Sequence, residues 1–266
     1  MPTTHRLSPD TQISLTDLAT RADSFHSDRN EADKEFKKLR KELAELQHRL
    51  YSEGKHKLLI VLQAMDAGGK DGTIRRVTQG INPQGVRVTS FKAPSKRELA
   101  HDYLWRVHQV VPGTGMIGIF NRSHYEDVLV VRVDDLVPER IWQQRFDQIN
   151  QFERLLSETG TTILKFYLHI SKDEQRQRFQ DRIDDPTKNW KFSHEDLEKR
   201  NQWDDYMQAY EDALNRCTTP WAPWFAIPSD QKWYRNLAIS RVLHATLTAI
   251  NPQYPAHEDL SGVTIP

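Results

Sequence analysis

The apolar residues of this chain recur with two different periods, and each period predicts one kind of secondary structure. In residues 31–51 they return every three or four positions, which predicts an amphipathic helix. The apolar positions of this helix are Phe36, Leu39, Leu43, Leu46 and Leu50. Residues 58–62 form a continuous apolar run instead, which is typical of a strand buried on both faces of a parallel sheet.

Short apolar runs and helical patterns alternate through the rest of the chain. The runs predict strands at 56–63, 86–91, 116–120, 162–170 and 224–227. Helices are expected from about residue 73, from Ser95 past Val107, over 138–158, after Ser171, after Ser193 and over 233–250. Glu174, three residues after Ser171, predicts a capping box at that helix start. Alternating strands and helices indicate a three-layer α/β/α sandwich around a mainly parallel five-stranded sheet.

The chain shows no internal repeat, low-complexity segment or long linker, so we expect a single domain over residues 31–266. Residues 1–30 are polar and irregular, and they are predicted to form an N-terminal extension that wraps the surface or mediates self-association. Within this extension, Thr16 and Asp17 are expected to cap a short helix. The helical residues at about 171–215 are predicted to form a lid.

Composition narrows the class of protein. Of the 266 residues, 37% are hydrophobic and 9% are aromatic, which is enough apolar surface for a packed core. The formal net charge is +0, so the total charge indicates no particular partner. The single cysteine, Cys217, excludes a disulfide framework within one chain and is expected to be an ordinary thiol near a helix end. Because no segment resembles a secretory signal or a membrane span, we expect a cytoplasmic protein without a membrane partner.

The loop after the first strand carries the parts of a phosphate-binding site. The sequence Ala64-Met-Asp-Ala-Gly-Gly-Lys-Asp-Gly-Thr73 places Gly68 and Gly69 before Lys70 at a helix start. Glycines let backbone N–H groups converge on an anion, and a helix N-terminus adds partial positive charge. The lysine can reach the transferable phosphates of a ligand. These parts in this order predict a phosphate-binding P-loop and a P-loop kinase-like fold.

Two positions depart from the usual P-loop pattern: Ala64 replaces the first glycine, and Asp71 replaces the Ser or Thr that normally holds Mg²⁺. A carboxylate inside the loop would repel phosphate unless a cation lay between them. We therefore interpret Asp66 as the ligand of Mg²⁺, with Mn²⁺ as a substitute. Thr73 offers a hydroxyl nearby, and Asp71 is expected to stabilise the first helical turn through the helix dipole. An ordinary glycine turn between a strand and a helix is the alternative interpretation.

A second group of candidate residues follows the third strand, in the sequence Phe120-Asn-Arg-Ser-His-Tyr-Glu-Asp127. Ligands of open α/β sheets bind outside the carboxyl ends of the strands, which is where this turn is expected. Arg122 can meet two phosphate oxygens at once, and Asn121 takes the strand-end position of a second metal ligand. Glu126 and Asp127 supply further carboxylates. A simple capping turn is the alternative.

Positive charge is concentrated locally even though the total is neutral. Between residues 70 and 97 the only acid is Asp71, whereas the bases are Lys70, Arg75, Arg76, Arg87, Lys92, Lys96 and Arg97. This balance indicates a phosphate-facing surface, with an ordinary solvated surface as the alternative. In the lid, Arg178 and Arg182 share one helix face and could neutralise a phosphoryl group in transfer. Surface ion pairs with neighbouring acids are the alternative for these arginines.

The loop at 64–73, the turn at 120–125 and the stretch 171–205 together resemble the polyphosphate kinase 2 family. Trp233-Tyr-Arg-Asn236 also looks like family sequence, and the resemblance runs from about residue 31 to 250. It implies Mg²⁺-dependent, reversible transfer of phosphoryl groups between inorganic polyphosphate and a nucleotide. It implies catalytic roles for Asp66, Lys70, Arg122 and Arg182, and assembly as a homo-oligomer, either a dimer or a tetramer.

Asn121 stands where many relatives have Asp, which shifts metal binding toward Asp66. Asn121 and Glu126 together resemble the single-domain, class III-like subgroup that accepts both AMP and ADP. Adenine nucleotides, and secondarily guanine nucleotides, are therefore the implied partners. Phosphate- or nucleotide-binding roles are predicted for Ala67, Gly68, Gly69, Asp71, Gly72, Thr73, Arg75, Lys92, Asn121, Glu126 and Arg178.

Two rival functions use the same features. An ATP-dependent nucleoside-monophosphate kinase would use the P-loop without polyphosphate, and a nucleic-acid-binding module would use the basic residues 70–97. We consider nucleic acid the weaker alternative because a P-loop favours a smaller or unbranched phosphate ligand. The sequence leaves open the direction of transfer, the base preference, the choice between AMP and ADP, and which substrate's phosphates occupy the loop.

Overall fold

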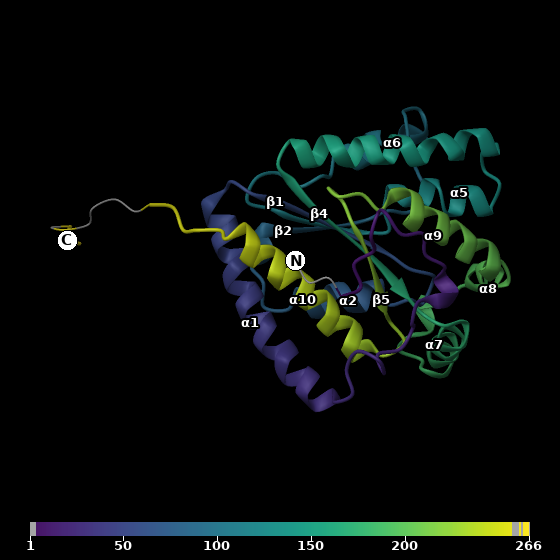
Figure 1. Cartoon of the computed structure of the whole chain (residues 1–266), viewed down its shortest axis with the longest axis horizontal. Coiled ribbons are helices and arrows are strands. Elements are labelled where there is room, and N and C mark those ends of the chain that lie inside the picture. The colour runs from purple at the N-terminus through teal and green to yellow at the C-terminus, as the bar shows by residue number, and fades with distance from the viewer. Residues whose placement is uncertain (1–3, 257–260, 262, 266) are drawn as a thin grey trace.

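A five-stranded parallel sheet forms the centre of the molecule (Figure 1). The structure is a computed structural model and describes residues 4–256, 261 and 263–265. The strands are β1 (Lys57–Gln63), β2 (Val86–Ser90), β3 (Ile117–Asn121), β4 (Thr161–His169) and β5 (Trp224–Pro228). Their order across the sheet is β2-β3-β1-β4-β5, and every neighbouring pair is parallel. The predicted number of strands and their direction are confirmed.

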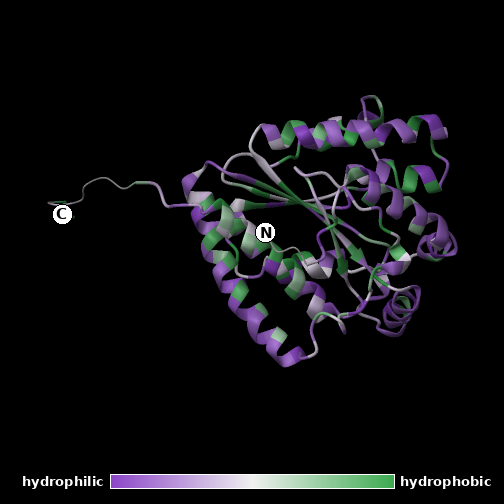
Figure 2. Cartoon of the chain, in the orientation of Figure 1, coloured by the Kyte–Doolittle hydropathy of each residue, from purple (hydrophilic) through white to green (hydrophobic). Residues whose placement is uncertain are grey.

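Strand β1 occupies the middle of the sheet because its side chains are apolar on both faces of the sheet. Leu59 and Val61 belong to one hydrophobic cluster, whereas Leu58, Ile60 and Leu62 belong to the other. Figure 2 shows the apolar strands between helices whose outer faces are polar. The chain runs from β1 outward to β2 and β3 on one side and to β4 and β5 on the other. The carboxyl end of β1 therefore lies at the switch point where such sheets bind ligands.

Helices cover both faces of this sheet (Figure 1). One layer contains α1 (Arg29–Glu53), α2 (Lys70–Val77) and α10 (Lys232–Ile250), whose buried residues share a cluster with Leu58 and Ile60. The other layer contains α5 (Val130–Val133), α6 (Glu139–Glu158) and α9 (Trp203–Cys217), and the buried residues of α6 and α9 share a cluster with Leu59. This arrangement is the predicted three-layer sandwich.

The segment from Ser171 to Asn201 extends beyond the sheet and forms the first part of the predicted lid. It consists of α7 (Lys172–Asp184), a 3₁₀ turn (Asn189–Lys191) and α8 (His194–Asn201). The rest of the predicted range, up to residue 215, belongs to α9, whose buried residues are part of the core. Ser171 and Ser193 cap the two helices as predicted. The capping box at Ser171 is only half formed, since the Glu174 carboxylate accepts a hydrogen bond from Arg178 Nε instead of turning back to the cap.

Two predicted helix boundaries are wrong. Helix α2 begins at Lys70, three residues earlier than expected, because Gly69 caps it with φ of 100°. The single helix expected after Ser95 is two short helices, α3 (Lys96–Leu99) and α4 (Trp105–His108). Between them the Asp102 side chain accepts a hydrogen bond from the Leu104 amide, a local turn that competes with helix continuation.

The N-terminal segment lies against the edge of the sheet. The Leu7 amide donates to Trp224 O and the Ala226 amide donates to His5 O, so this segment pairs antiparallel with β5. Leu7, Leu15 and Ala22 are buried, and residues 15–17 form a short 3₁₀ helix. Thr16 and Asp17 lie inside this helix, so their predicted role as its cap is wrong. Across the described part of the chain, no helix is long and apolar enough to cross a membrane.

Candidate functional site

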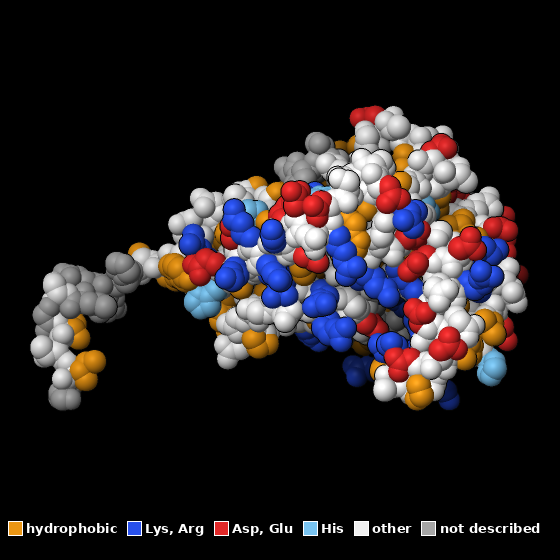
Figure 3. Space-filling view, turned by 90° about the horizontal axis from the view of Figure 1, so that it is seen from below, with side chains coloured by type: hydrophobic (Ala, Val, Ile, Leu, Met, Phe, Trp, Pro, Cys, Tyr) orange, Lys and Arg blue, Asp and Glu red, His pale blue; other side chains and the backbone are white. Residues whose placement is uncertain are grey.

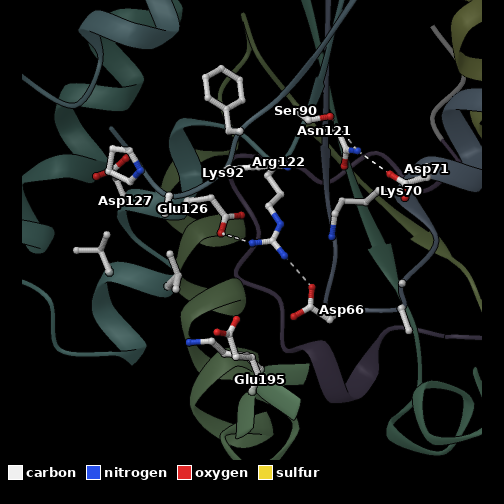
Figure 4. Close-up of a pocket in the computed structure, with 18 of the residues that line it drawn as sticks. Asp66, Lys70, Asp71, Ser90, Lys92, Asn121, Arg122, Glu126, Asp127 and Glu195 are labelled. Carbon is white, nitrogen blue, oxygen red and sulfur yellow. Dashed lines mark hydrogen bonds and ion pairs between the residues drawn. The ribbon is translucent and has the colours of Figure 1, made fainter. Parts of the chain in front are cut away.

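A cavity of about 1460 Å³ opens at the carboxyl edge of the sheet, between the strand ends and the lid (Figure 4). It brings together the four residues with predicted catalytic roles: Asp66, Lys70, Arg122 and Arg182. The other predicted site residues on its wall are Ala67, Gly68, Gly69, Asp71, Gly72, Arg75, Lys92, Asn121, Glu126 and Arg178. Figure 3 shows Lys and Arg side chains in a band across the lower face of the molecule, beside a hollow next to the lid.

The loop between β1 and α2 is tightly constrained at its glycines. A Cβ atom at Gly68 would overlap Ala64 Cβ and the Met65 carbonyl oxygen. Gly69 has a positive φ, and a Cβ there would overlap the guanidinium of Arg235. Ala67 also has a positive φ of 59°, which costs about 1–2 kcal/mol for a residue that carries a Cβ. The loop is therefore held in a strained conformation by its surroundings, as expected at a functional site.

Arg178 holds this loop from the lid side. Its side chain is 6% exposed, and its Nη1 donates to the carbonyl oxygens of Ala67 and Gly68 at 2.9 and 3.0 Å. Its Nη2 donates to Ser229 O and Asp230 O, while Nε donates to Glu174. All three nitrogens of the guanidinium therefore donate to acceptors of the protein itself. Arg178 positions the loop, whereas the sequence analysis had assigned it to phosphate.

Lys70 lies inside the loop. Its Nζ donates to the carbonyl oxygen of Ala64 at 2.9 Å, which keeps the amino group beside the loop backbone. Burial lowers the pKa of Lys70, and the nearby Arg122 guanidinium lowers it further, while Asp66 and Glu126 act in the opposite direction. An anionic ligand would favour the charged amine in the same way as these carboxylates. Lys70 is therefore suited to binding a phosphate.

Arg122 projects into the cavity between two carboxylates (Figure 4). Its Nη2 donates to Asp66 Oδ1 at 2.8 Å, and its Nη1 lies 3.8 Å from Glu126 Oε2. Burial alone would lower the pKa of Arg122, but the charges of Glu126 and Asp66 outweigh burial and raise it. Its backbone has φ of 61°, so the turn after β3 is strained where it directs this side chain. The structure thus joins the loop and the turn that the sequence indicated separately.

Asn121 and Asp71 contact each other across the site. Asn121 Nδ2 donates to Asp71 Oδ1 at 2.7 Å and lies 3.4 Å from Ser90 Oγ. Asp71 therefore links the first turn of α2 to the ends of β2 and β3. Thr73 does not reach the cavity: it is fully buried and its hydroxyl donates to Gly69 O. The structure gives no support to the phosphate contact predicted for Thr73.

The lid residue Arg182 faces the cavity but is paired. Its Nη1 donates to Lys191 O at 3.0 Å and to Asp196 Oδ2 at 3.2 Å. Its partner is thus an acid of α8, whereas the sequence suggested acids of its own helix. Burial, and then the negative charge of Asp66, raise the pKa of Asp196. The Arg182–Asp196 pair joins α7 to α8 within the lid.

The basic residues 70–97 do not form one surface at the site. Lys70, Arg75 and Lys92 line the cavity, whereas the other four bases of this range do not. Arg75 and Lys92 are exposed at the rim. The sequence therefore overestimated the cations that line the cavity: Arg76 on α2, Arg87 on β2, and Lys96 and Arg97 on α3 do not reach it.

Several residues on the cavity wall were missed by the sequence analysis. The segments that follow β2 and β3 contribute apolar residues to the wall, interspersed with charged ones such as Arg106 and Asp127: Phe91, Ala93, Pro94, Leu99, Tyr103, Val130, Val131, Leu136 and Val137. The first turn of α10 contributes Lys232 and Arg235. The apolar residues of the wall come from separate segments without a common sequence pattern.

A buried ionic network lies beneath the Arg122 turn. Lys165 and Glu153 are both 0% exposed, with Nζ and Oε2 2.6 Å apart. Lys165 Nζ also donates to the Tyr125 hydroxyl, which in turn donates to Glu153 Oε1 at 2.9 Å, and His124 Nε2 lies 3.1 Å from the same oxygen. Burial would raise the pKa of Glu153, but Lys165 and His124 outweigh burial and lower it. This network fixes the turn from below.

Cys217 plays no part in the site. It is the last residue of α9, it is buried, and it forms no disulfide. Burial raises the pKa of its thiol to about 12, so the thiol stays protonated. The ordinary thiol expected from the sequence is confirmed.

Comparison with known proteins shows clear relatives. The family model described as Polyphosphate kinase 2 (PPK2) matches residues 26–255. The chain is 60% identical over 223 residues to the AMP/ADP-polyphosphate phosphotransferase of Meiothermus ruber, a match that covers 84% of each protein. It is 44% identical over 256 residues to the ADP-polyphosphate phosphotransferase of Rhodopseudomonas palustris, covering 92% of this chain and 89% of that protein.

A solved structure has the same fold. The crystal structure of Polyphosphate Kinase 2 from Arthrobacter aurescens TC1 matches with a TM-score of 0.91 and 40% sequence identity. The match covers 95% of this chain and 90% of that one. The fold, including the arrangement of strands around the loop, is therefore shared along nearly the whole length of both chains.

The Gly69→Ala variant is expected to lose more stability than a glycine variant outside the loop. Alanine at Gly69 combines an unfavourable positive φ with overlap against the Arg235 guanidinium. Gly80 also has a positive φ, of 91°, but a Cβ there meets nothing within 4 Å. In urea unfolding, Gly80→Ala should cost about 1–2 kcal/mol for the backbone alone, and Gly69→Ala should cost at least about 1 kcal/mol more. Equal losses would contradict the close packing of the loop.

The Lys165→Met variant tests whether the buried network is ionic. Removing one partner of a buried ion pair leaves an uncompensated charge and typically costs about 3–5 kcal/mol. Urea unfolding should show a loss of this size for Lys165→Met, and the double variant Lys165→Met/Glu153→Leu should recover part of it. A loss below about 1 kcal/mol in the single variant would mean that Lys165 and Glu153 are not a charged pair.

Proposed function

Since the chain belongs to the polyphosphate kinase 2 family, we propose that it transfers phosphoryl groups between inorganic polyphosphate and adenine nucleotides, with AMP and ADP as acceptors. The observation that carries the proposal is the joining of Lys70, Arg122 and Asp66 around one strained loop at the switch point of the sheet. The names of the Meiothermus ruber and Rhodopseudomonas palustris relatives support the substrates. Guanine nucleotides are a secondary expectation.

The cavity wall offers groups for both parts of a nucleotide. Its apolar residues, among them Phe91, Pro94 and Leu136, can bury a purine ring. The polar part beside it contains the loop and Arg122, which can bind the phosphates. A nucleotide that lies across both parts would present its terminal phosphate beside Lys70.

We include Mg²⁺ in the proposal because the donor set at the loop suits it. Oδ2 of Asp66 accepts no hydrogen bond from a described residue, and the Glu126 carboxylate lies on the other side of Arg122. Among the described residues, no three His, Cys, Asp or Glu side chains gather closely enough to hold a metal ion by themselves. Mg²⁺ commonly binds one or two carboxylates and completes its shell with phosphate oxygens and water. When bound, it would neutralise phosphate charge during transfer, and Mn²⁺ is expected to substitute.

The residues of the chain act by positioning and by charge. The acceptor is an anionic phosphate oxygen of AMP or ADP, so no general base is needed. The bond between the terminal phosphorus of polyphosphate and its bridging oxygen breaks as the new bond forms, and the polyphosphate leaves one unit shorter. Lys70 and Arg122 bind the oxygens of the reacting groups, and Arg182 supplies further positive charge once the lid closes.

The two rival functions receive less support. A nucleic-acid-binding module would use the bases of residues 70–97 as an outer surface, but three of them, Lys70, Arg75 and Lys92, line the cavity. An ATP-dependent nucleoside-monophosphate kinase uses the same loop, and it predicts ADP formation from ATP and AMP without polyphosphate. A cytoplasmic location and a homo-oligomer of two or four chains stay predictions from the sequence.

The direct test combines purified protein, Mg²⁺, long-chain polyphosphate and either AMP or ADP. Chromatography of the nucleotides should show ADP or ATP forming only when polyphosphate is present. A parallel reaction with ATP and AMP but no polyphosphate measures the rival kinase activity. No product from polyphosphate with either Mg²⁺ or Mn²⁺ would overturn the proposal.

Two loop variants test the assigned roles. Asp66→Asn and Lys70→Ala should each lower turnover by about a hundredfold or more, because each removes a charged group next to the reacting phosphates. Arg76→Ala is the matched control, since Arg76 lies on the same helix but is exposed and does not line the cavity. It should retain normal turnover. Near-normal rates in either loop variant would refute the role given to that residue.

A further inference from the structure

Gln175 is a buried glutamine of the lid whose side-chain amide is hydrogen-bonded at both ends. It lies near the start of α7, is only 1% exposed and does not line the cavity. Its Nε2 donates to the carbonyl oxygen of Asp66 at 3.0 Å, and its Oε1 accepts from Arg200 Nη1 at 2.9 Å. One end of the amide therefore contacts the loop, and the other end contacts α8.

Gln175 and Arg178 together hold three consecutive carbonyl groups of the loop. Arg178, three residues further along α7, binds the carbonyl oxygens of the two residues that follow Asp66. The contact that Gln175 makes at Asp66 bears directly on the site, because the Asp66 carboxylate accepts from Arg122 at 2.8 Å (Figure 4). A displacement of the Asp66 backbone would therefore move both of these charged side chains.

The contact at Asp66 O also supports the strained backbone of the loop. A trans peptide unit is planar, with its N–H opposite its C=O, so a hydrogen bond at Asp66 O also fixes the direction of the Ala67 N–H. Ala67 has φ of 59°, a conformation that persists only when its surroundings enforce it. Without the glutamine amide, we expect this peptide unit to rotate and the loop to relax.

Arg200 connects this contact to the second helix of the lid (Figure 1). Its Nη1 donates to both Gln175 Oε1 and Lys172 O, which holds α8 against the start of α7. The preceding residue, Lys199, forms an ion pair with Asp134 at the end of α5, on the cavity wall. Helix α8 therefore links the cavity wall to the glutamine that supports the loop.

We propose that Gln175 is a positioning residue, which holds the backbone of Asp66 in the conformation needed for transfer and which Arg200 couples to the position of α8. A glutamine suits this role because its amide donates at one end and accepts at the other, so it can join a carbonyl oxygen to a guanidinium. Since neither Gln175 nor Arg200 lines the cavity, both act through other residues. The effect on turnover rests on the proposed function, whereas the effect on the loop does not.

Steady-state kinetics with polyphosphate and ADP tests the effect on turnover. We expect Gln175→Met to lower kcat about tenfold to a hundredfold, because a displacement of about 1 Å at a reacting centre has effects of this size. KM for each substrate should stay within about threefold, since the change removes no ligand contact. A kcat within twofold of the wild type would overturn the positioning role, and so would a raised KM with an unchanged kcat.

Gln180→Met is the matched control. This glutamine lies on the same helix, but it is exposed, does not line the cavity and donates to Asp184 of its own helix. Its replacement should leave kcat and both KM values unchanged. Equal losses of kcat in Gln175→Met and Gln180→Met would mean that any change in α7 slows the enzyme, which would contradict a specific role for Gln175.

A double-mutant cycle separates positioning from a general loss of structure. If Gln175 acts through Asp66, Gln175→Met should lower kcat less than about threefold in an Asp66→Asn background, because coupled residues are not additive. A purely structural effect would give the same loss in both backgrounds and would refute the positioning role. Gln175→Glu keeps an acceptor for Arg200 but places a carboxylate oxygen against Asp66 O, so it should be at least as slow as Gln175→Met.

Hydrogen exchange tests the loop conformation without the reaction. In mass spectrometry of the ligand-free protein, Gln175→Met should speed exchange in the peptide that covers residues 64–73 at least about tenfold, and Gln180→Met should not. Arg200→Met should also speed exchange there, because Gln175 loses its support from α8. Unchanged exchange in this peptide for Gln175→Met would overturn the inference. Faster exchange in α8 alone for Arg200→Met would overturn the coupling between α8 and the loop.

The two proposals can fail separately. A wild type without activity on polyphosphate would refute the proposed function, while faster loop exchange in Gln175→Met would still support the positioning role. An active wild type whose kcat and loop exchange do not change in Gln175→Met would refute the positioning role alone. If Gln175→Met does not fold, Gln175→Glu and Arg200→Met take its place in both measurements, and each should lower kcat and speed loop exchange.

Discussion

The packing of two buried guanidinium groups against one short loop is the constraint on which the rest of the site depends. Arg178 binds the carbonyl oxygens of Ala67 and Gly68, and Arg235 fills the space that a side chain at Gly69 would need. The carbonyl oxygens are thereby drawn to the protein side of the loop. This orientation accounts for the two glycines and for the positive φ of Ala67, since a relaxed loop could not meet both arginines.

Arg122 depends on a second, independent support. The turn that carries it is strained at φ of 61°, and the buried Lys165–Glu153 pair holds that turn through Tyr125. A buried ion pair contributes little net stability when compared with apolar residues of the same volume. Its value here is geometric, because it fixes the turn whose arginine must reach Asp66 from a different strand. Both halves of the site are therefore supported by buried charged groups, Arg178 and Arg235 at the loop and the Lys165–Glu153 pair beneath the turn.

The sequence predicted the elements that depend on a local pattern of residues. It missed the side-chain contacts between residues that are far apart in the chain. The five strands, the loop and the turn after β3 follow from apolar runs and glycine spacing within about ten residues. The role of Arg178 could not be predicted, because its acceptors belong to a loop more than a hundred residues earlier and to the end of β5. The contact between Asp71 and Asn121 likewise joins two separate elements, helix α2 and strand β3. The position of Arg178 on its helix face suggested that it binds phosphate. In the folded protein it instead donates to backbone carbonyl oxygens of the loop and holds the loop in place.

The distribution of charge explains how a neutral chain can bring two polyanions together. Two carboxylates, Asp66 of the loop and Glu126 of the turn after β3, flank Arg122. At the α10 end, Arg235 forms no ion pair with a described residue, whereas the charges of Glu174 and Asp181 partly offset the lowering of the pKa of Lys232. A paired cation keeps its position whether or not ligand is present, whereas an unpaired one gains most from a ligand's charge. Positioning at the reacting centre and attraction at the end of the loop are thus assigned to different residues, and a net charge of +0 places no limit on either.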